Sequence, residues 1–512
     1  MDAVARGIGF TTSEKFVAEL ADRAFLRLWA YPNTFIDKLK SGKGVGKEFA
    51  DLLVVFGDDV LIFSVKDCEW LNSDDPNLAW TRWFRRAIES SAKQLMGAQR
   101  WLTDFEDRIF LDPECKQRFP YDFPPSGRRR VHCISVAFGA TEAARKHFDD
   151  DSGTFFILPH IKGRNHTNPE SEGFMPFAVG DIDPQKPFVH VFDPQALSIV
   201  LSELDTADDF VQYIKCREDF IRSGRLGMAA GEEELLAHYL QVPTDAFDRH
   251  HFGLDDLPSD FDDHLISIPN GQYQGLVNSS EYSRKKAADE VSYAWDDLID
   301  NFVEHVLAGT SVEILDTQPT VPLAERGLRL MAAEPRIYRR VLGQSFLEAM
   351  QEAEAKEAAR FVRVVKSPSG RTLFVFLILA YPKEELEHGY DQYRQVRTAI
   401  LETYCMRAFR QLTGADYAVG IAIDASPTVS GVEGGSEDLV ALAKPEWTPE
   451  TLKQFRAACD AYDIKPKRPL KKKYVSDTEF PLDQDPPKNR AEKRARRADS
   501  RRSLKRRAKL RR

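Results

Sequence analysis

One aspartate and one lysine stand at the ends of two apolar runs that a tight turn joins. Asp51 precedes the apolar run 52–56, and Lys66 follows the run 60–65. Residues 57–59, Gly-Asp-Asp, are typical of a β-hairpin turn. A charged side chain at the end of a buried strand needs a partner or a function. A carboxylate binds hard cations and a lysine can orient or activate water, so this pair suits metal-assisted hydrolysis of a phosphodiester.

The length of the turn decides whether the acid and the amine meet. Side chains alternate between the two faces of a strand. A turn with an even number of residues therefore places Asp51 on the same face as Ser64 and Lys66, and a three-residue turn separates them. The proposed chemistry requires an even turn.

Asp51 and the tripeptide Ser64-Val65-Lys66 on such a hairpin resemble the motif of the PD-(D/E)xK nuclease superfamily, the restriction-endonuclease-like proteins. The resemblance implies that Asp51 and a second acid bind Mg²⁺ or Mn²⁺ with help from the Val65 carbonyl, while Lys66 positions the attacking water. Ser64 departs from the family pattern, in which this position carries the second carboxylate. Three other acids are candidates to replace it: Glu19, Glu48 and Asp67.

The segments around the hairpin predict a mixed α/β core. Apolar residues recur at helical spacing over 13–24, and Glu19 lies beside that stripe, from which it could face inward. A strand is predicted over 25–29, a long helix over 77–101 and a strand over 128–138. With the hairpin, this gives the α-β-β-β-α-β order that restriction-endonuclease-like proteins share.

The helix predicted over 77–101 supplies further candidates. Gln94 falls on or beside the buried stripe and needs a polar partner. In nucleases that this chain resembles, the helix after the lysine strand contributes a Gln or a basic residue, which implies roles for Gln94 and Lys93. Arg82, Arg86 and Lys93 form a second stripe, either a nucleic-acid contact or a solvated face.

A second α+β domain is predicted over 291–462. Its expected elements are helices near 295–306 and over 324–356, a hairpin of strands 361–365 and 372–381, a helix over 391–412 and a strand over 417–423. The order helix, hairpin, helix, strand echoes the first domain. No matching acid and lysine are present, so this part is either a degenerate second copy or a site for a protein partner.

The charge of the chain is unevenly distributed. Residues 488–512 contain fourteen Lys or Arg and two acids, a charge of +12. Because the whole chain carries −9, residues 1–487 carry −21. A basic, disordered tail is predicted to bind nucleic-acid phosphates or to mask the acidic body. Its arginines include Arg496, Arg497, Arg506 and Arg507.

Length and composition limit the possible classes of protein. At 512 residues the chain should form several domains, and 42% hydrophobic residues is ordinary for a globular protein. The apolar stretch 373–381 is too short to span a bilayer, and no secretory signal pattern is present. Six widely spaced cysteines without a C-x-x-C pair predict reduced thiols, no zinc site and a cytoplasmic location.

These patterns predict four parts: a nuclease-like domain over 1–225, an acidic connector over 226–290, the second α+β domain over 291–462 and a disordered basic tail over 463–512. The predicted function is that of a Mg²⁺- or Mn²⁺-dependent nuclease. The resemblance favours DNA as substrate and a role in restriction or phage defence. One alternative is a catalytically impaired module that binds nucleic acid or assembles with partners. Another is an effector that a protein partner activates through residues 291–462.

Overall fold

The chain forms two compact units, described separately here. The N-terminal unit comprises residues 5–283, and the C-terminal unit comprises residues 2–4 and the described residues from 284 onward. The computed structural model describes residues 2–481 except for 39–45, 72, 150–152, 246–247, 255–264, 312–318, 381–388, 426–435, 468 and 471–477.

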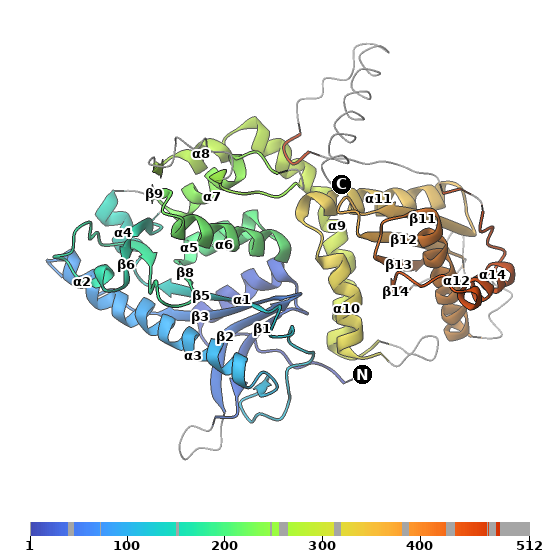
Figure 1. The fold of residues 1–512 in the computed structure, drawn as a ribbon, viewed down its shortest axis with the longest axis horizontal. Coiled ribbons are helices and arrows are strands. Elements are labelled where there is room, and N and C mark those ends of the chain that lie inside the picture. The colour runs from blue at the N-terminus through green and yellow to red at the C-terminus, as the bar shows by residue number, and fades with distance from the viewer. Residues whose placement is uncertain are drawn as a thin grey trace, which may run out of the picture. The chain divides into compact units, whose positions relative to one another are not determined.

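A six-stranded mixed sheet is the centre of the N-terminal unit (Figure 1). Its strand order is β4-β1-β2-β3-β5-β8, where β1, β2 and β3 pair antiparallel and β3, β5 and β8 pair parallel. The strands are β1 (Ala30–Ile36), β2 (Lys47–Phe56), β3 (Asp59–Asp67), β4 (Ile109–Phe110), β5 (Arg130–Phe138) and β8 (Val189–Phe192).

Helices cover both faces of this sheet (Figure 1). Phe25 of α1 packs against Phe63 of β3, whereas Ser91 of α3 donates a hydrogen bond to the Ser64 carbonyl. The order α1, β1, β2, β3, α2–α3, β4, β5 agrees with the predicted succession of helices and strands except for the additional two-residue strand β4. The helices are α1 (Thr12–Phe25), α2 (Pro76–Phe84), α3 (Ser90–Asp104), α5 (Pro194–Glu203) and α6 (Ala207–Arg222).

The first strand lies later in the chain than predicted. The strand expected over 25–29 is wrong: α1 continues to Phe25, and the strand begins at Ala30. Pro32 lies inside this strand although it cannot donate a backbone hydrogen bond. It is tolerated because β4 pairs only with Phe35 and Ile36, which leaves the outer edge of β1 beside Pro32 without a strand partner in the described chain.

The helix predicted over 77–101 contains a π-helical turn, η1 (Arg85–Glu89), between α2 and α3. A π turn inserts one extra residue and so rotates the helix that follows. The buried positions nevertheless keep the predicted helical spacing, from Trp80 and Trp83 in α2 to Ser91 and Leu95 in α3.

The acidic stretch 226–290 is not a separate connector. Its part up to Ser283 belongs to the N-terminal unit, where it supplies two strands of a second sheet with the order β10-β9-β6-β7 and the buried helix α7. Leu235 and Leu236 of α7 are fully buried. The elements are α4 (Thr141–Phe148), β6 (Phe156–Lys162), β7 (Ala178–Asp181), β9 (Leu226–Ala229), α7 (Glu232–Gln241), β10 (Ile266–Ile268) and α8 (Gln272–Val277).

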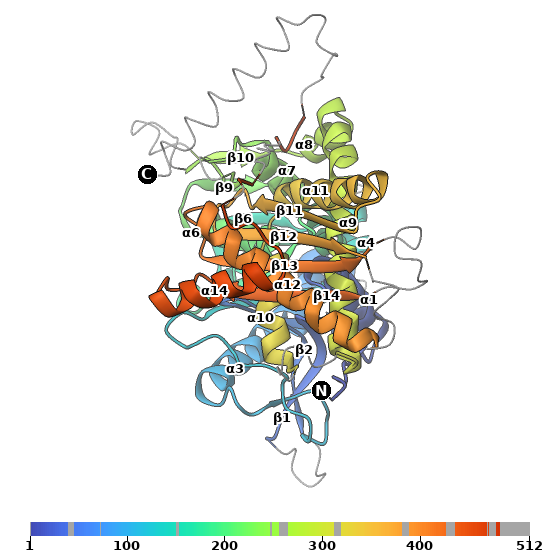
Figure 2. The same ribbon diagram turned by 90° about the vertical axis from the view of Figure 1, so that its right-hand side faces the viewer.

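A four-stranded sheet of order β11-β12-β13-β14 is the centre of the C-terminal unit (Figure 2). Along β12, Leu373 and Val375 face α12, while Phe374 contacts Trp295 of α9. The elements are α9 (Ser280–Ala308), α10 (Val321–Ala332), α11 (Arg336–Ala355), β11 (Arg360–Lys366), β12 (Thr372–Leu379), α12 (Tyr390–Gln411), β13 (Tyr417–Asp424), β14 (Glu437–Ala443) and α14 (Pro449–Ala461).

The two sheets share a connection pattern. In the N-terminal unit β2 pairs antiparallel with β3, and β5 returns parallel to β3 after α3. In the C-terminal unit β11 pairs antiparallel with β12, and β13 returns parallel to β12 after α12. The predicted echo of helix, hairpin, helix and strand is confirmed at the level of topology. That the second unit is a degenerate copy stays a prediction.

Three other expectations are revised or confirmed. The helix predicted over 324–356 is two helices, because Pro335 precedes α11. Part of the predicted disordered tail is held in place: Arg340 donates hydrogen bonds to the carbonyls of Thr478 and Glu479. The remaining basic tail, with Arg496, Arg497, Arg506 and Arg507, lies outside the described residues. All six cysteines are free, as predicted.

Candidate functional site

The β2–β3 hairpin has the even turn that the proposed chemistry requires. Phe56 pairs with Asp59, so the turn consists of Gly57 and Asp58, and Gly57 has a φ of 62°, which suits a tight hairpin. Leu52 pairs with Phe63, which places the next positions, Asp51 and Ser64, together on the other face of the sheet. Lys66, two residues after Ser64, faces the same side.

The polar partner that was expected for Gln94 is Lys66. The Lys66 Nζ atom donates a hydrogen bond of 2.7 Å to Gln94 Oε1. Gln94 lies on α3, which also places Ser91 against the Ser64 carbonyl at 3.4 Å. The prediction that Gln94 needs a polar partner beside the hairpin is confirmed.

Glu48 joins the same face of the sheet through a β-bulge. Thr34 pairs with Ala50, but its neighbour Phe35 pairs with Glu48, so Phe49 is an extra residue in β2. In a regular strand Glu48 and Asp51 would point to opposite faces, and one inserted residue restores them to the same face. Of the acids proposed to replace the family's second carboxylate, Glu48 is the one that the structure places beside Asp51.

Burial and neighbouring charges change the acidity of the Asp51 and Glu48 carboxyls. Burial raises the pKa of Asp51, although the Val65 backbone N–H donates to its carboxylate and the Lys66 ammonium is close enough to oppose the shift. Burial and then the charge of Asp51 raise the pKa of Glu48 to about 7. The charge of Glu14 also raises the pKa of Asp51. Acids whose charges oppose one another's ionisation form a site that attracts cations.

Asn33 and Glu14 complete the cluster, and sequence reasoning missed both. Asn33 Nδ2 donates to Glu14 Oε2 at 2.9 Å and to Glu48 Oε1 at 3.2 Å. Burial opposes ionisation of Glu14, but hydrogen bonds from Asn33 and from the Phe10 N–H outweigh it and lower its pKa. Asn33 has a φ of 52°, a conformation that Asn adopts more readily than most residues. In the sequence, the position of Asn33 directly after Pro32 was a sign of this unusual backbone conformation, because Pro and Asn are both common in turns.

Ser64 supplies no strong ligand. It is fully buried, and its hydroxyl has no hydrogen-bond partner of good geometry in the described chain. It is nevertheless close enough to Asp51 to act against the rise in the pKa of that carboxyl. Its departure from the family's acidic position is therefore a real difference in chemistry at this site.

Several predicted residues lie elsewhere. Glu19, which could have faced inward from beside the apolar stripe, is exposed on α1. Asp67 is exposed at the end of β3 and accepts a hydrogen bond from Ser13. Three basic side chains of α2, η1 and α3 are also exposed, which leaves them accessible to phosphates without orienting them: Arg82, Arg86 and Lys93. The Arg86 guanidinium donates to the Glu69 carbonyl.

The donor set fits Mg²⁺ better than a metal that needs a closed cage. Within the described part of the chain, no group of three or more His, Cys, Asp or Glu side chains is arranged to hold a metal ion. Mg²⁺ commonly binds one or two carboxylates and keeps several waters. Asp51 and Glu48, whose proximity costs free energy while both are ionised, offer such a pair. A role for the Val65 carbonyl stays a prediction.

Comparisons with protein-family models, curated proteins and solved structures found no match for this chain. No helix among the residues that the structure describes is long and apolar enough to cross a membrane.

Proposed function

We propose that the face of the β2–β3 hairpin is the active site of a nuclease that hydrolyses phosphodiester bonds in nucleic acid, with DNA the favoured substrate. The observation that carries this proposal is the Lys66–Gln94 hydrogen bond beside two carboxylates, Asp51 and Glu48. The order of helices and strands around the hairpin supports a restriction-endonuclease-like core.

Each residue has a separate role in the proposed reaction. Gln94 orients the Lys66 ammonium, which positions the attacking water and donates to phosphate oxygen. Asp51, oriented by the Val65 N–H, and Glu48, oriented by Asn33, hold the divalent ion. Bound Mg²⁺ or Mn²⁺ would supply stabilisation of the negative charge on the phosphate oxygens.

A direct test compares wild type, Lys66→Ala and Lys15→Ala on plasmid, linear and single-stranded DNA and on RNA, in Mg²⁺ and in Mn²⁺. We expect Lys66→Ala to lose about a hundredfold or more in cleavage rate, the usual effect of removing a group that assists proton transfer. The exposed Lys15 of α1 is the matched control, and its variant should cleave like wild type. Equal cleavage by Lys66→Ala and wild type would contradict the proposed role.

The neutral Ser64 favours one alternative, a protein that binds nucleic acid without cleaving it. In that case Mg²⁺ would not bind in a way that depends on Asp51. Calorimetric titration of Mg²⁺ into wild type and Asp51→Ala separates the two functions. Binding to wild type that Asp51→Ala abolishes supports the nuclease. Identical titrations of both proteins support the non-catalytic alternative.

A further inference from the structure

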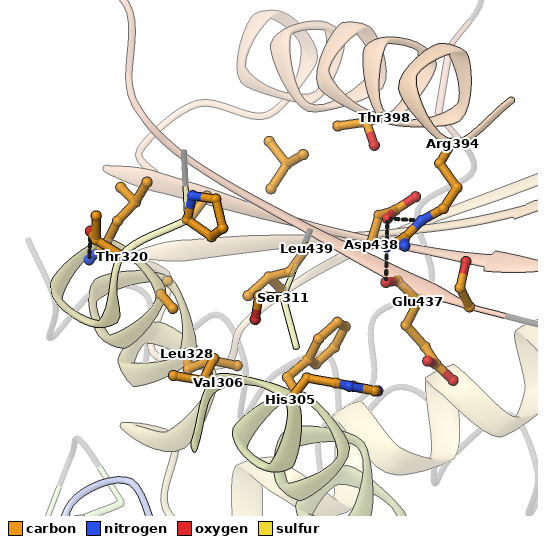
Figure 3. A pocket seen from close by; sticks show the side chains of 18 of the residues that line it. His305, Val306, Ser311, Thr320, Leu328, Arg394, Thr398, Glu437, Asp438 and Leu439 are labelled. Atoms are coloured by element: carbon orange, nitrogen blue, oxygen red, sulfur yellow. Dashed lines mark hydrogen bonds and ion pairs between the residues drawn. The ribbon is translucent and has the colours of Figure 1, made fainter. Parts of the chain in front are cut away.

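A hollow of about 690 Å³ follows the end strand of the C-terminal sheet (Figure 3). Seven consecutive residues, 436–442, line it. Side chains of a strand alternate between its two faces, so a hollow that touches consecutive residues from Glu437 to Leu442 of β14 lies along the edge of that strand. β14 is the last strand in the sheet order, and no other strand in the described chain pairs with its outer edge.

Beyond its first two residues, Glu437 and Asp438, the edge of β14 lacks the features that usually prevent pairing with another strand. Protected edges carry charged residues, proline or a bulge. β11, at the opposite end of the sheet, carries Arg360, Arg363 and Lys366. By contrast, residues 439–443 of β14 are Leu-Val-Ala-Leu-Ala, and the strand pairs regularly with β13 from Glu437 onward. Residues 439–443 therefore form a regular, apolar part of the edge that is suited to accept a strand.

One wall of the hollow is apolar. Val306 of α9 and Leu328 of α10 lie beneath the strand in Figure 3, and Leu323 of α10 also lines the hollow while 48% exposed. Gly327 lets α10 approach the strand closely, because an added Cβ would lie 3.3 Å from the Cβ of Ala441. Apolar side chains on an incoming strand could bury themselves against this wall.

The other wall is polar and comes from α12. Arg394, Thr398 and Glu402 line the hollow at intervals of four residues, so they share one face of the helix. Thr398 is only 3% exposed, yet its hydroxyl has no hydrogen-bond partner within the described chain. Arg394 is engaged by Asp438 at 2.6 Å (Figure 3). An unpaired buried hydroxyl costs free energy that a ligand can recover.

The charge of the hollow indicates what kind of strand it accepts. Asp438 in the lining is paired with two guanidiniums, Arg394 and the neighbouring Arg397. With Glu402 and Glu437 of the lining, this leaves a charge of −1 with His305 neutral, and Glu402 and Glu437 are its acidic groups. We propose that the edge of β14 binds an extended segment of a partner protein that adds to the sheet as a fifth strand. The segment carries apolar residues toward α10 that alternate with basic residues toward α12. This proposal does not depend on the nuclease site.

The test measures the fluorescence anisotropy of a labelled peptide, Lys-Val-Lys-Val-Lys-Val, mixed with the full chain. We expect it to bind at least tenfold more tightly than Glu-Val-Glu-Val-Glu-Val. Two further peptides carry N-methyl groups on the Val amides or on the Lys amides. Because alternate amides of a strand point to opposite edges, one methylated peptide should lose binding and the other should keep it. Equal binding by both would overturn the strand-addition proposal.

Variants of the chain locate the bound peptide. Glu402→Lys should weaken binding of the lysine peptide about three- to tenfold, the range of one exposed charge contact. Glu354→Lys, which changes an exposed acid of α11, should leave it unchanged. Thr398→Val should raise the thermal stability of the free protein but weaken peptide binding. Unchanged affinity in both Glu402→Lys and Thr398→Val would overturn the proposal. So would the finding that the protein is a dimer that must dissociate before the peptide binds.

Discussion

Glu48 links the acidity of the site to the stability of the protein. Its pKa of about 7 in the folded chain lies above its ordinary value of 4.5, so the folded state holds this proton more tightly than the unfolded state. Stability therefore falls as pH rises from about 4.5 to about 7, and the loss persists above that range. We expect Glu48→Gln to be about 1–3 kcal/mol more stable than wild type at pH 8.5, and close to it at pH 4.5. Urea unfolding at both pH values measures this.

Mg²⁺ provides the control for that experiment. If Glu48 and Asp51 hold the ion, Mg²⁺ at pH 8.5 should raise the midpoint of thermal unfolding of wild type more than that of Glu48→Gln. The exposed Glu19 supplies the matched variant Glu19→Gln, which should respond to Mg²⁺ like wild type. An identical Mg²⁺ response in wild type and Glu48→Gln would contradict the assignment of Glu48 as a ligand.

In the proposed reaction Gln94 acts through Lys66, to which it is hydrogen-bonded, and this limits what its loss can do. We expect Gln94→Ala to lower the cleavage rate about tenfold, less than Lys66→Ala, because the ammonium remains but loses its 2.7 Å partner. In the double variant Lys66→Ala/Gln94→Ala the second change should add little. Single-turnover cleavage measures all three, with Gln99→Ala on the same helix as control. Additive losses would show that Gln94 acts independently of Lys66.

At the scale of elements, the site depends on two irregularities, the bulge in β2 and the π turn η1. Deletion of the exposed Arg85 should convert η1 to an ordinary helical turn and rotate α3 by roughly 100° relative to α2. Gln94 would then leave Lys66. We expect cleavage to fall at least as far as in Gln94→Ala, while far-UV circular dichroism still reports a helical protein.

The matched variant Arg85→Ala keeps the length of the helix and removes only an exposed side chain, so its activity should equal that of wild type. Full activity in the deletion variant would mean that the π turn does not position Gln94. The deletion should also lower the free energy of unfolding by a few kcal/mol. Either the buried side chains of α2 or those of α3 would no longer face the core.

The elements could be predicted to different extents, for physical reasons. The hairpin, the helix of α3 and the strand β5 follow from local patterns of apolar residues and turn chemistry, which the chain displays directly. The first strand was predicted too early because the largely apolar residues 25–29 suit a strand as well as the helix end and turn that they form. Glu14 and Asn33 were missed because their meeting with Glu48 joins three separate segments.

At the scale of the whole molecule, the basic tail is a prediction from the sequence that the described structure does not test. Removal of residues 488–512 takes away a charge of +12. We expect non-specific DNA affinity to fall and the slope of log affinity against log salt concentration to become shallower by several units. Anisotropy titrations of labelled DNA at four salt concentrations measure this slope.

A chain with the order of residues 488–512 scrambled provides the control. Counterion release depends on the number of charges and not on their order, so the scrambled tail should bind DNA like wild type. Wild-type affinity in the truncated protein would instead favour a tail that masks the acidic body. Cleavage at the hairpin site should persist in both variants, because the site lies entirely within the N-terminal unit.

The sequence by itself determined the hairpin and the condition for Asp51 and Lys66 to share a face, an even turn, because the alternation of side chains is a local property. The pairing of Phe56 with Asp59 then decided that the turn is even. The sequence could not determine which acid joins them. Glu48 reaches Asp51 only through a bulge whose extra residue appears when β2 pairs with β1. The hollow along β14 likewise exists only after helices from distant parts of the sequence pack around this edge strand. Pairing between separate segments of the chain decided both, and such pairing is a property of the tertiary structure.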